Sequence, residues 1–234
     1  MFCEEKNNQV YIRGEIKSMP IYSHEVYGEG FYEMDFSVER LSGQCDIVPV
    51  TISERLLSEV NVEIGEVLTI FGQFRSYNKL SSGKSKLVLT VFARNILEND
   101  FSKNPNVIAL SGYICKPTIF RTTPFAREIA DILVAVNRSF GKSDYIPAIA
   151  WGRNARFAQS LEVGSQLSVI GRIQSRQYTK KTETTEETRT AFEISISRIG
   201  EWELMERVVA EESANFAKKY TATKEDTIRI PLGD

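Results

Sequence analysis

The sequence predicts an all-β protein made of two tandem five-stranded barrels, each with a short helix between its third and fourth strands. Three observations predict this class. The chain has 234 residues, of which 42% are hydrophobic, and this is enough for two cores. A unit of about 95 residues occurs twice. Each copy holds strand-like segments and one helical segment in the order of the OB fold.

The internal repeat keeps a nearly constant offset. Gly14 in VYIRGEI matches Gly112 in IALSGYI, and the same offset relates Asp46 to Asp144. One inserted residue later, the segment FGQFRS matches IGRIQS. Several matched segments in the same order are explained more simply by duplication than by chance. We therefore expect two copies of one fold.

The first copy shows the later elements of this fold most clearly. Ser53–Val60 predicts the short helix, Val67–Ser76 the fourth strand and Lys86–Leu97 the fifth. We expect this first OB domain to occupy residues 1–101.

The second copy shows all of its elements and is expected to occupy residues 105–200. Alternation and β-branched residues predict five strands, at Val107–Ile114, Glu128–Asn137, Asp144–Trp151, Gln166–Ser175 and Ala191–Ile199. The segment GRNARFAQSL, Gly152–Leu161, has helical spacing of its apolar residues, and Gly164 follows it as a stop signal.

Three other segments have the composition of connections or tails. Asp100–Asn106 contains Asn, Ser, Lys and Pro and is predicted to link the two units. Thr179–Thr190 is polar and low in complexity, and is predicted to be a long, mobile hairpin tip. Within residues 201–234, Glu201–Tyr220 is predicted to form a helix that either docks on the rest of the chain or binds a partner.

The charge distribution places any anionic partner on the second copy. The whole chain carries a net charge of −2. Residues 1–104 contain 11 Lys and Arg against 15 Asp and Glu, whereas residues 105–200 contain 13 against 8. Since only the second copy has a positive surplus, a polyanion is expected to contact that copy first.

The cysteines and the hydropathy of the chain indicate a cytoplasmic protein. Cys3, Cys45 and Cys115 are scattered and odd in number, which fits a reducing compartment and neither a disulfide framework nor a zinc site. The first residues show no apolar signal segment, and no stretch reaches membrane-spanning length. We expect no membrane partner.

Aromatic rings interleaved with cations form the candidate site. A protein that binds single strands needs cations along the phosphates and flat rings on which bases stack. The rings lie at strand ends or on strands of the second copy: Phe140, Tyr145, Trp151 and Tyr178. The accompanying cations are Arg138, Lys142, Arg172 and Arg176. An even spacing of six aims Tyr145 and Trp151 at one face of a regular strand. The alternative is that one or two of the rings belong to the barrel core.

The second copy resembles the bacterial single-stranded DNA-binding protein family. The resemblance lies in LSGYICKPTIFRTTPFAREIADILVAVNRSF followed by DYIPAIAWGRNARFAQSLEVGSQLSVIGRIQSRQY. It implies an OB fold, four OB domains assembled around DNA, and base stacking on the four rings named above. It also implies basic contacts at Arg121, Arg138, Arg153, Arg172 and Arg176. Two barrels per chain would reach four as a homodimer. The implied roles are DNA replication, recombination and repair.

The first copy departs from that pattern. The offset puts Ser42, Ile47 and Ser53 where three of the rings stand, and only Tyr77 lies near the position of Tyr178. The first copy is therefore expected to be mainly structural. The alternative is that rings of the loop between its first two strands replace the lost ones: Tyr22, Tyr27, Phe31 and Tyr32.

The end of the chain also departs from the family. The family ends in an acidic tail with an apolar tip that recruits replication and repair proteins. This chain ends in TKEDTIRIPLGD, with Arg229 in place of an acidic run. Recruitment of such partners through this tail is therefore in doubt.

No feature of the sequence predicts an enzyme or a cofactor. His24 is the only histidine, and one ligand makes no metal site. Glu33 and Asp35 are more typical of a solvated strand than of a nuclease centre. Neither GxxxxGK[ST] nor GxGxxG occurs. Two other functions remain open, an interaction scaffold and an RNA-binding module, because OB barrels serve several ligand classes.

Overall fold

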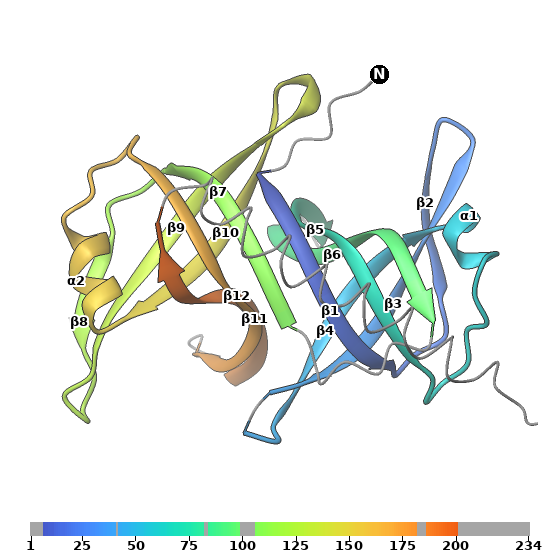
Figure 1. The fold of residues 1–234 in the computed structure, drawn as a ribbon, viewed down its shortest axis with the longest axis horizontal. Helices are drawn as coiled ribbons and strands as arrows, with labels where there is room; N and C mark the ends of the chain where they lie inside the picture. Colours follow the sequence, from blue (N-terminus) through green and yellow to red (C-terminus); the bar gives the residue numbers. More distant parts are fainter. Residues whose placement is uncertain (1–6, 41, 82–83, 99–105, 182–185, 201–234) are drawn as a thin grey trace, which may run out of the picture.

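The computed structural model describes residues 7–40, 42–81, 84–98, 106–181 and 186–200, and these form two β-barrels side by side (Figure 1). Across the described residues, twelve strands join in a single sheet. Each barrel has one short α-helix after its fourth strand in chain order. The predicted all-β class with two tandem OB barrels is confirmed.

The first barrel closes through strands β1, β3, β4, β6 and β5. Its elements are β1 (Asn8–Ile16), β2 (Ile21–Val26), β3 (Glu29–Glu39), β4 (Cys45–Ser53), α1 (Glu54–Leu57), β5 (Val67–Ser81) and β6 (Lys84–Glu98). β1 pairs with β5 on one side and with β3 on the other, and β4 pairs in parallel with β6. This ring of pairings is the OB topology.

The second barrel repeats the same ring. Its elements are β7 (Asn106–Ile114), β8 (Ile119–Thr122), β9 (Glu128–Arg138), the 3₁₀ turn η1 (Ser139–Gly141), β10 (Lys142–Trp151), α2 (Arg153–Gln159), β11 (Gln166–Lys181) and β12 (Glu186–Ile199). β7 pairs with both β11 and β9, and β10 pairs in parallel with β12.

Each barrel has one strand more than the sequence predicts. β2 and β8 form hairpins with β3 and β9 outside the closed ring. Every residue of β2 is exposed, so this strand lacks the buried alternation by which strands are recognised in a sequence. The hairpins turn at residues with positive φ, Tyr27 and Gly28 in the first and Ala126 in the second.

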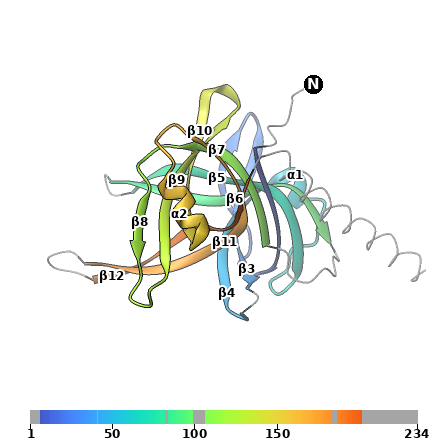
Figure 2. The same cartoon turned by 60° about the vertical axis from the view of Figure 1, so that its left-hand side comes forward.

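The two long hairpins, β5–β6 and β11–β12, project on the same side of the molecule (Figure 2). Strand pairing continues from Gln177 opposite Thr190 to Thr179 opposite Thr188. The prediction that Thr179–Thr190 is a long hairpin tip is therefore wrong in extent. Threonine is β-branched and favours extended backbone, so much of this polar segment extends the strands.

The repeated glycines lie where each barrel closes. A Cβ on Gly112 would lie 2.4 Å from the carbonyl oxygen of Ala135, and one on Gly14 would lie 2.9 Å from that of Ser37. β1 and β7 each pass between two partner strands at this point, so the backbones approach too closely for a side chain.

The two barrels are joined through β1 and β7. These strands pair antiparallel over five positions, from Asn8 opposite Leu110 to Ile12 opposite Asn106. The pairing makes one continuous sheet of both barrels. The rest of the predicted linker before Asn106, and the predicted C-terminal helix and tail, lie outside the described residues.

Candidate nucleic-acid interface

Two of the four predicted rings stand on the outward side of β10. Alternation along the strand buries Asp144 and Ile146 and directs Tyr145 and Trp151 outward. Tyr145 is 46% exposed and Trp151 is 39% exposed, so neither ring fills the core. We call the outward side of β9, β10, β12 and β11 the outer face of the second barrel.

Strand β11 adds a third ring and two arginines to this face. Ile149 of β10 lies opposite Ser195 of β12, and Ser195 lies opposite Arg172 of β11. Steps of two residues along β11 lead from Arg172 to Arg176 and Tyr178, so all three project from the outer face. All three side chains are exposed.

The fourth ring, Phe140, stands at the turn between β9 and β10. It is 90% exposed and has a φ of 64°, in the left-handed region that non-glycine residues seldom adopt. Lys142 and Arg138 pair across the base of this turn. The structure thus puts one ring and two cations at one end of the outer face.

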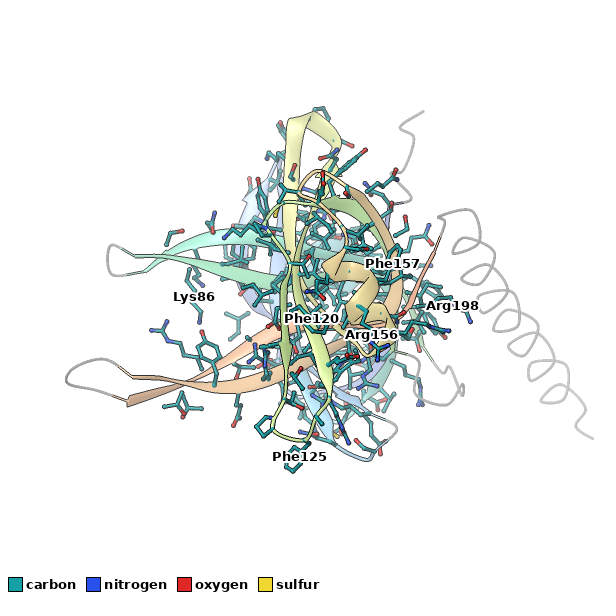
Figure 3. The ribbon with its side chains drawn as sticks, turned by 90° about the vertical axis from the view of Figure 1, so that its left-hand side faces the viewer. Lys86, Phe120, Phe125, Arg156, Phe157 and Arg198 are labelled. Carbon is teal, nitrogen blue, oxygen red and sulfur yellow. The ribbon has the colours of Figure 1, made fainter. Side chains whose placement is uncertain are left out.

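The two cations implied only by the resemblance are Arg121 and Arg153. Arg121 lies opposite Ile129 of β9, and Ile129 lies opposite Trp151 of β10, so Arg121 projects on the same side of the sheet as Trp151. Arg121 of β8 donates to Asp131 on β9, with 2.9 Å between Nε and Oδ2. Arg153 begins α2 and lines a hollow of about 660 Å³ with Phe157 and Arg198. Figure 3 shows Phe157 and Arg198 on this side of the barrel. Arg153 therefore lies at the opposite end of β10 from Phe140.

Carboxylates moderate the positive charge of the outer face. Glu193 of β12 lies 3.6 Å from Arg176 and accepts a 2.9 Å hydrogen bond from Gln174. Since Arg176 is half exposed in this pair, a phosphate can compete for it at low cost.

Arg138 also faces the first barrel. Its Nε lies 3.5 Å from Oδ2 of Asp144, a fully buried carboxylate. The other oxygen of Asp144 accepts a 2.7 Å hydrogen bond from the backbone N–H of Ser76, on β5 of the first barrel. Oδ2 itself makes no hydrogen bond within the described residues. Burial raises the pKa of Asp144, and the bonds from Ser76 and the charge of Arg138 only partly oppose this.

The repeat places a matching contact on the other side of the junction. Arg40 donates two hydrogen bonds of 2.6 Å to Asp46, and the backbone N–H and hydroxyl of Ser175 donate to the same carboxylate. Arg40 also donates to the carbonyl of Ser175. Burial raises the pKa of Asp46, but these hydrogen bonds outweigh it, so the pKa lies below its ordinary value.

We call the outward side of β3, β4, β6 and β5 the outer face of the first barrel. It has no rings at the positions of Tyr145 and Trp151, but it carries other rings. Ile47, which is exposed, and Ser53, which is buried and caps α1, stand on β4 where the second barrel has Tyr145 and Trp151. Phe92 of β6 contacts Phe31 of β3, with 5.5 Å between ring centroids. The guanidinium of Arg75 lies 3.9 Å above the Phe92 ring.

The buried contacts fix the correspondence of the two long hairpins. The backbone N–H of Ser76 donates to Asp144, and the backbone N–H of Ser175 donates to Asp46 in the same way. Tyr77 therefore corresponds to Arg176, and Lys79 corresponds to Tyr178.

Sequence reasoning missed two kinds of ring. Phe92 of the first barrel was not a candidate, although its place in an alternating strand puts it on the outer face with Arg75. Phe125, 87% exposed at the β8–β9 turn, and Phe157 on α2 were also missed (Figure 3). Exposure at a turn or on a short helix leaves no periodic signal in a sequence.

The described residues hold no group of three or more His, Cys, Asp or Glu side chains placed to bind a metal ion. Of the helices they form, none has the length and apolar character needed to cross a membrane.

Comparison with known proteins bears on the second barrel. Residues 105–205 match the model of the single-strand binding protein family. Single-stranded DNA-binding protein 2 of Listeria innocua is 35% identical over 80 residues, which are 31% of this chain and 50% of that protein. Single-stranded DNA-binding protein A of Bacillus subtilis is 35% identical over 80 residues, 31% of this chain and 46% of that protein. The chain thus spans about half the length of the curated relatives it matches.

A solved structure extends the likeness to both barrels. The wild-type single-stranded DNA binding protein from Thermus aquaticus superposes with a TM-score of 0.66 over 82% of this chain and 91% of that chain, at 20% identity. This likeness concerns the fold alone. The sequence of the second barrel, residues 105–205, is thus similar to the single-strand binding protein family.

Proposed function

We propose that this protein binds single-stranded DNA with little sequence preference and protects it during replication, recombination or repair. The observation that carries the proposal is the outer face of the second barrel, where exposed rings and arginines alternate. Bases stack on rings whatever their identity, while cations follow the phosphates. Relatives of the second barrel are named for the same ligand.

The proposed binding residues divide into two roles. Phe140, Tyr145, Trp151 and Tyr178 offer ring surfaces for bases. Their four exposures range from 39% to 90%, so no core rearrangement is needed to contact a base. The cations contact phosphates, and they are Arg121, Arg138, Lys142, Arg153, Arg172 and Arg176. No step of bond making or breaking is part of this function, so we propose a binding protein and not an enzyme.

We propose further that two chains associate into a dimer with four OB domains, which acts in the cytoplasm at the nucleoid. The support is the match of the second barrel to the family model, and light scattering at micromolar concentration tests the assembly. A measured mass equal to that of one chain would contradict the proposed dimer, and it would leave the proposal of DNA binding unchanged. Contact with other replication or repair proteins belongs to the same proposal.

Replacement of Trp151 by alanine tests the function directly. Loss of one stacking platform is expected to weaken binding to oligo-dT by about 1–3 kcal/mol. Affinity is measured by fluorescence anisotropy of a labelled oligomer at two salt concentrations. The matched control is Phe125→Ala, which removes an exposed ring from the β8–β9 turn instead of from the outer face. Equal affinities of wild type and Trp151→Ala would contradict the site.

Oligomers of rU in the same assay separate DNA binding from RNA binding. Salt-insensitive or absent binding of every oligomer would instead favour the interaction scaffold, because phosphate neutralisation makes affinity fall with salt.

A further inference from the structure

A hollow of about 550 Å³ opens on the outer face of the first barrel, the half of the chain that carries a net negative charge. Its charged lining has the opposite balance, with one carboxylate, Glu33, and three cations. Two of the cations, Arg75 and Lys79, belong to β5. The third is Arg138, which reaches the hollow from the second barrel.

Aromatic groups line the same hollow. Phe92 forms part of its wall, and the cation of Arg75 lies over that ring. Tyr77 is 37% exposed and donates a 3.0 Å hydrogen bond to Glu33. His24 stacks on Phe31 at 5.2 Å beside them. Rings next to cations are the combination that binds single strands, although none of these residues corresponds to a ring position of the second barrel.

The hollow adjoins the outer face of the second barrel. The backbone N–H of Tyr145 donates a 2.7 Å hydrogen bond to the hydroxyl of Ser76, and Ser76 lines the hollow. A strand that stacks on Tyr145 therefore has the hollow as its next contact across the junction.

Arg138 is held more weakly than its counterpart. Arg40 makes two hydrogen bonds of 2.6 Å to Asp46, whereas Arg138 lies 3.5 Å from Asp144. Its side chain is also more exposed, 28% against 17%. Arg138 can thus turn towards an anion in the hollow, whereas Arg40 stays hydrogen-bonded to Asp46 between the barrels.

We infer that this hollow is a second contact site for single-stranded DNA, in which Arg138, Arg75 and Lys79 hold a backbone phosphate as the strand passes between the barrels. The inference rests on the proposed function of the second barrel. It gives the first barrel a binding role built from Arg75 and Lys79 of its own strand β5 together with Arg138 of the second barrel.

Substitution of Lys79 by glutamine tests the inference in the full-length protein. Arg55→Gln is the matched control, because Arg55 is an exposed cation of the first barrel that lies on α1, outside the hollow. Both variants are titrated with dT oligomers of increasing length, since one OB fold covers about 4–16 nucleotides. A second readout maps photo-crosslinks from iodouracil-substituted oligomers by mass spectrometry.

For oligomers that span both barrels, Lys79→Gln is expected to lower affinity about fivefold and to reduce the salt slope by about 0.7, the value for one phosphate of a single strand. Short oligomers held by the second barrel are expected to be unaffected, and Arg55→Gln is expected to match wild type. Crosslinks to the peptide that contains Tyr77 are expected in addition to crosslinks in the second barrel.

The two proposals fail in different ways. Equal behaviour of Lys79→Gln and Arg55→Gln, with crosslinks confined to residues 106–200, would overturn the second site and leave the proposed function standing. Failure of wild type to bind any oligomer would overturn both.

Discussion

The two barrels share their buried framework and differ on their outer faces. Asn8 of the first barrel and Asn106 of the second each exchange two hydrogen bonds with the backbone of a partner strand, at Phe74 and Ile173. On the outer face, by contrast, Tyr145 and Trp151 of one barrel correspond to Ile47 and Ser53 of the other. Duplication has preserved what holds each barrel together, and the surface has diverged.

The buried contacts between the two barrels, which we call the junction, have also diverged between the two copies. Both barrels direct an aspartate, Asp46 or Asp144, at a serine of the other barrel. Arg40 satisfies Asp46 completely, whereas Arg138 leaves Oδ2 of Asp144 without a hydrogen bond. A tight contact thus serves stability, and the looser one leaves an arginine available to a ligand.

The largest effect should come from breaking the tight contact. Asp46→Asn places an amide donor against the donors of Arg40 and leaves that cation without its counter-charge, which is expected to cost about 3–5 kcal/mol. Asp144→Asn keeps an acceptor for Ser76 and should cost less than about 1 kcal/mol. Urea unfolding of both variants at pH 7 measures the difference, with the m-values compared. Equal losses would show that the two contacts are equivalent.

The contributions of Asp46 and Asp144 to the stability of the folded protein are expected to change with pH in opposite directions. The folded pKa of Asp46 is lowered, so its stabilisation is present above the ordinary value of 3.8 and is lost as pH falls below it. The folded pKa of Asp144 is raised, so its ionisation destabilises the folded protein, and stability is recovered as pH falls towards 3.8. Unfolding midpoints of wild type relative to each Asn variant check both signs when they are measured from neutral pH to below the ordinary value of 3.8.

The closure glycines offer a second comparison. Gly112→Ala would set a Cβ 2.4 Å from a backbone oxygen, and Gly14→Ala would set it at 2.9 Å. Overpacking typically costs about 1–3 kcal/mol, and we expect the second barrel to lose more than the first. Thermal unfolding of the two variants would contradict this if Gly14→Ala were the less stable one.

The buried part of this fold could be predicted from the sequence because burial leaves a periodic pattern. Gly152–Leu161 predicts a helix, and the structure has one at Arg153–Gln159. The fully exposed strand β2 has no such pattern and was missed. The match of FGQFRS with IGRIQS already aligns Ser76 with Ser175 and so puts Lys79, and not Tyr77, at the position of Tyr178. The contacts of the two serines agree with this alignment.

The hollow of the first barrel could not be predicted for a different reason. Its cations come from β5 and from the end of β9, Arg75 and Arg138 among them, which are far apart in the sequence and belong to different copies. No single segment contains both, so their proximity depends on how β1 and β7 join the barrels.

The smallest effect is expected from restoring a ring to the first barrel. Ile47 is 44% exposed on β4 and corresponds to Tyr145, so Ile47→Tyr adds a stacking platform without disturbing the core. Long dT oligomers should bind up to about 1 kcal/mol more tightly, the low end of the stacking range. Ile47→Ala is the control for loss of the native side chain. If Ile47→Tyr binds no better than Ile47→Ala, then strands do not reach this part of β4, and the path of the strand over the first barrel is confined to the hollow around Arg75.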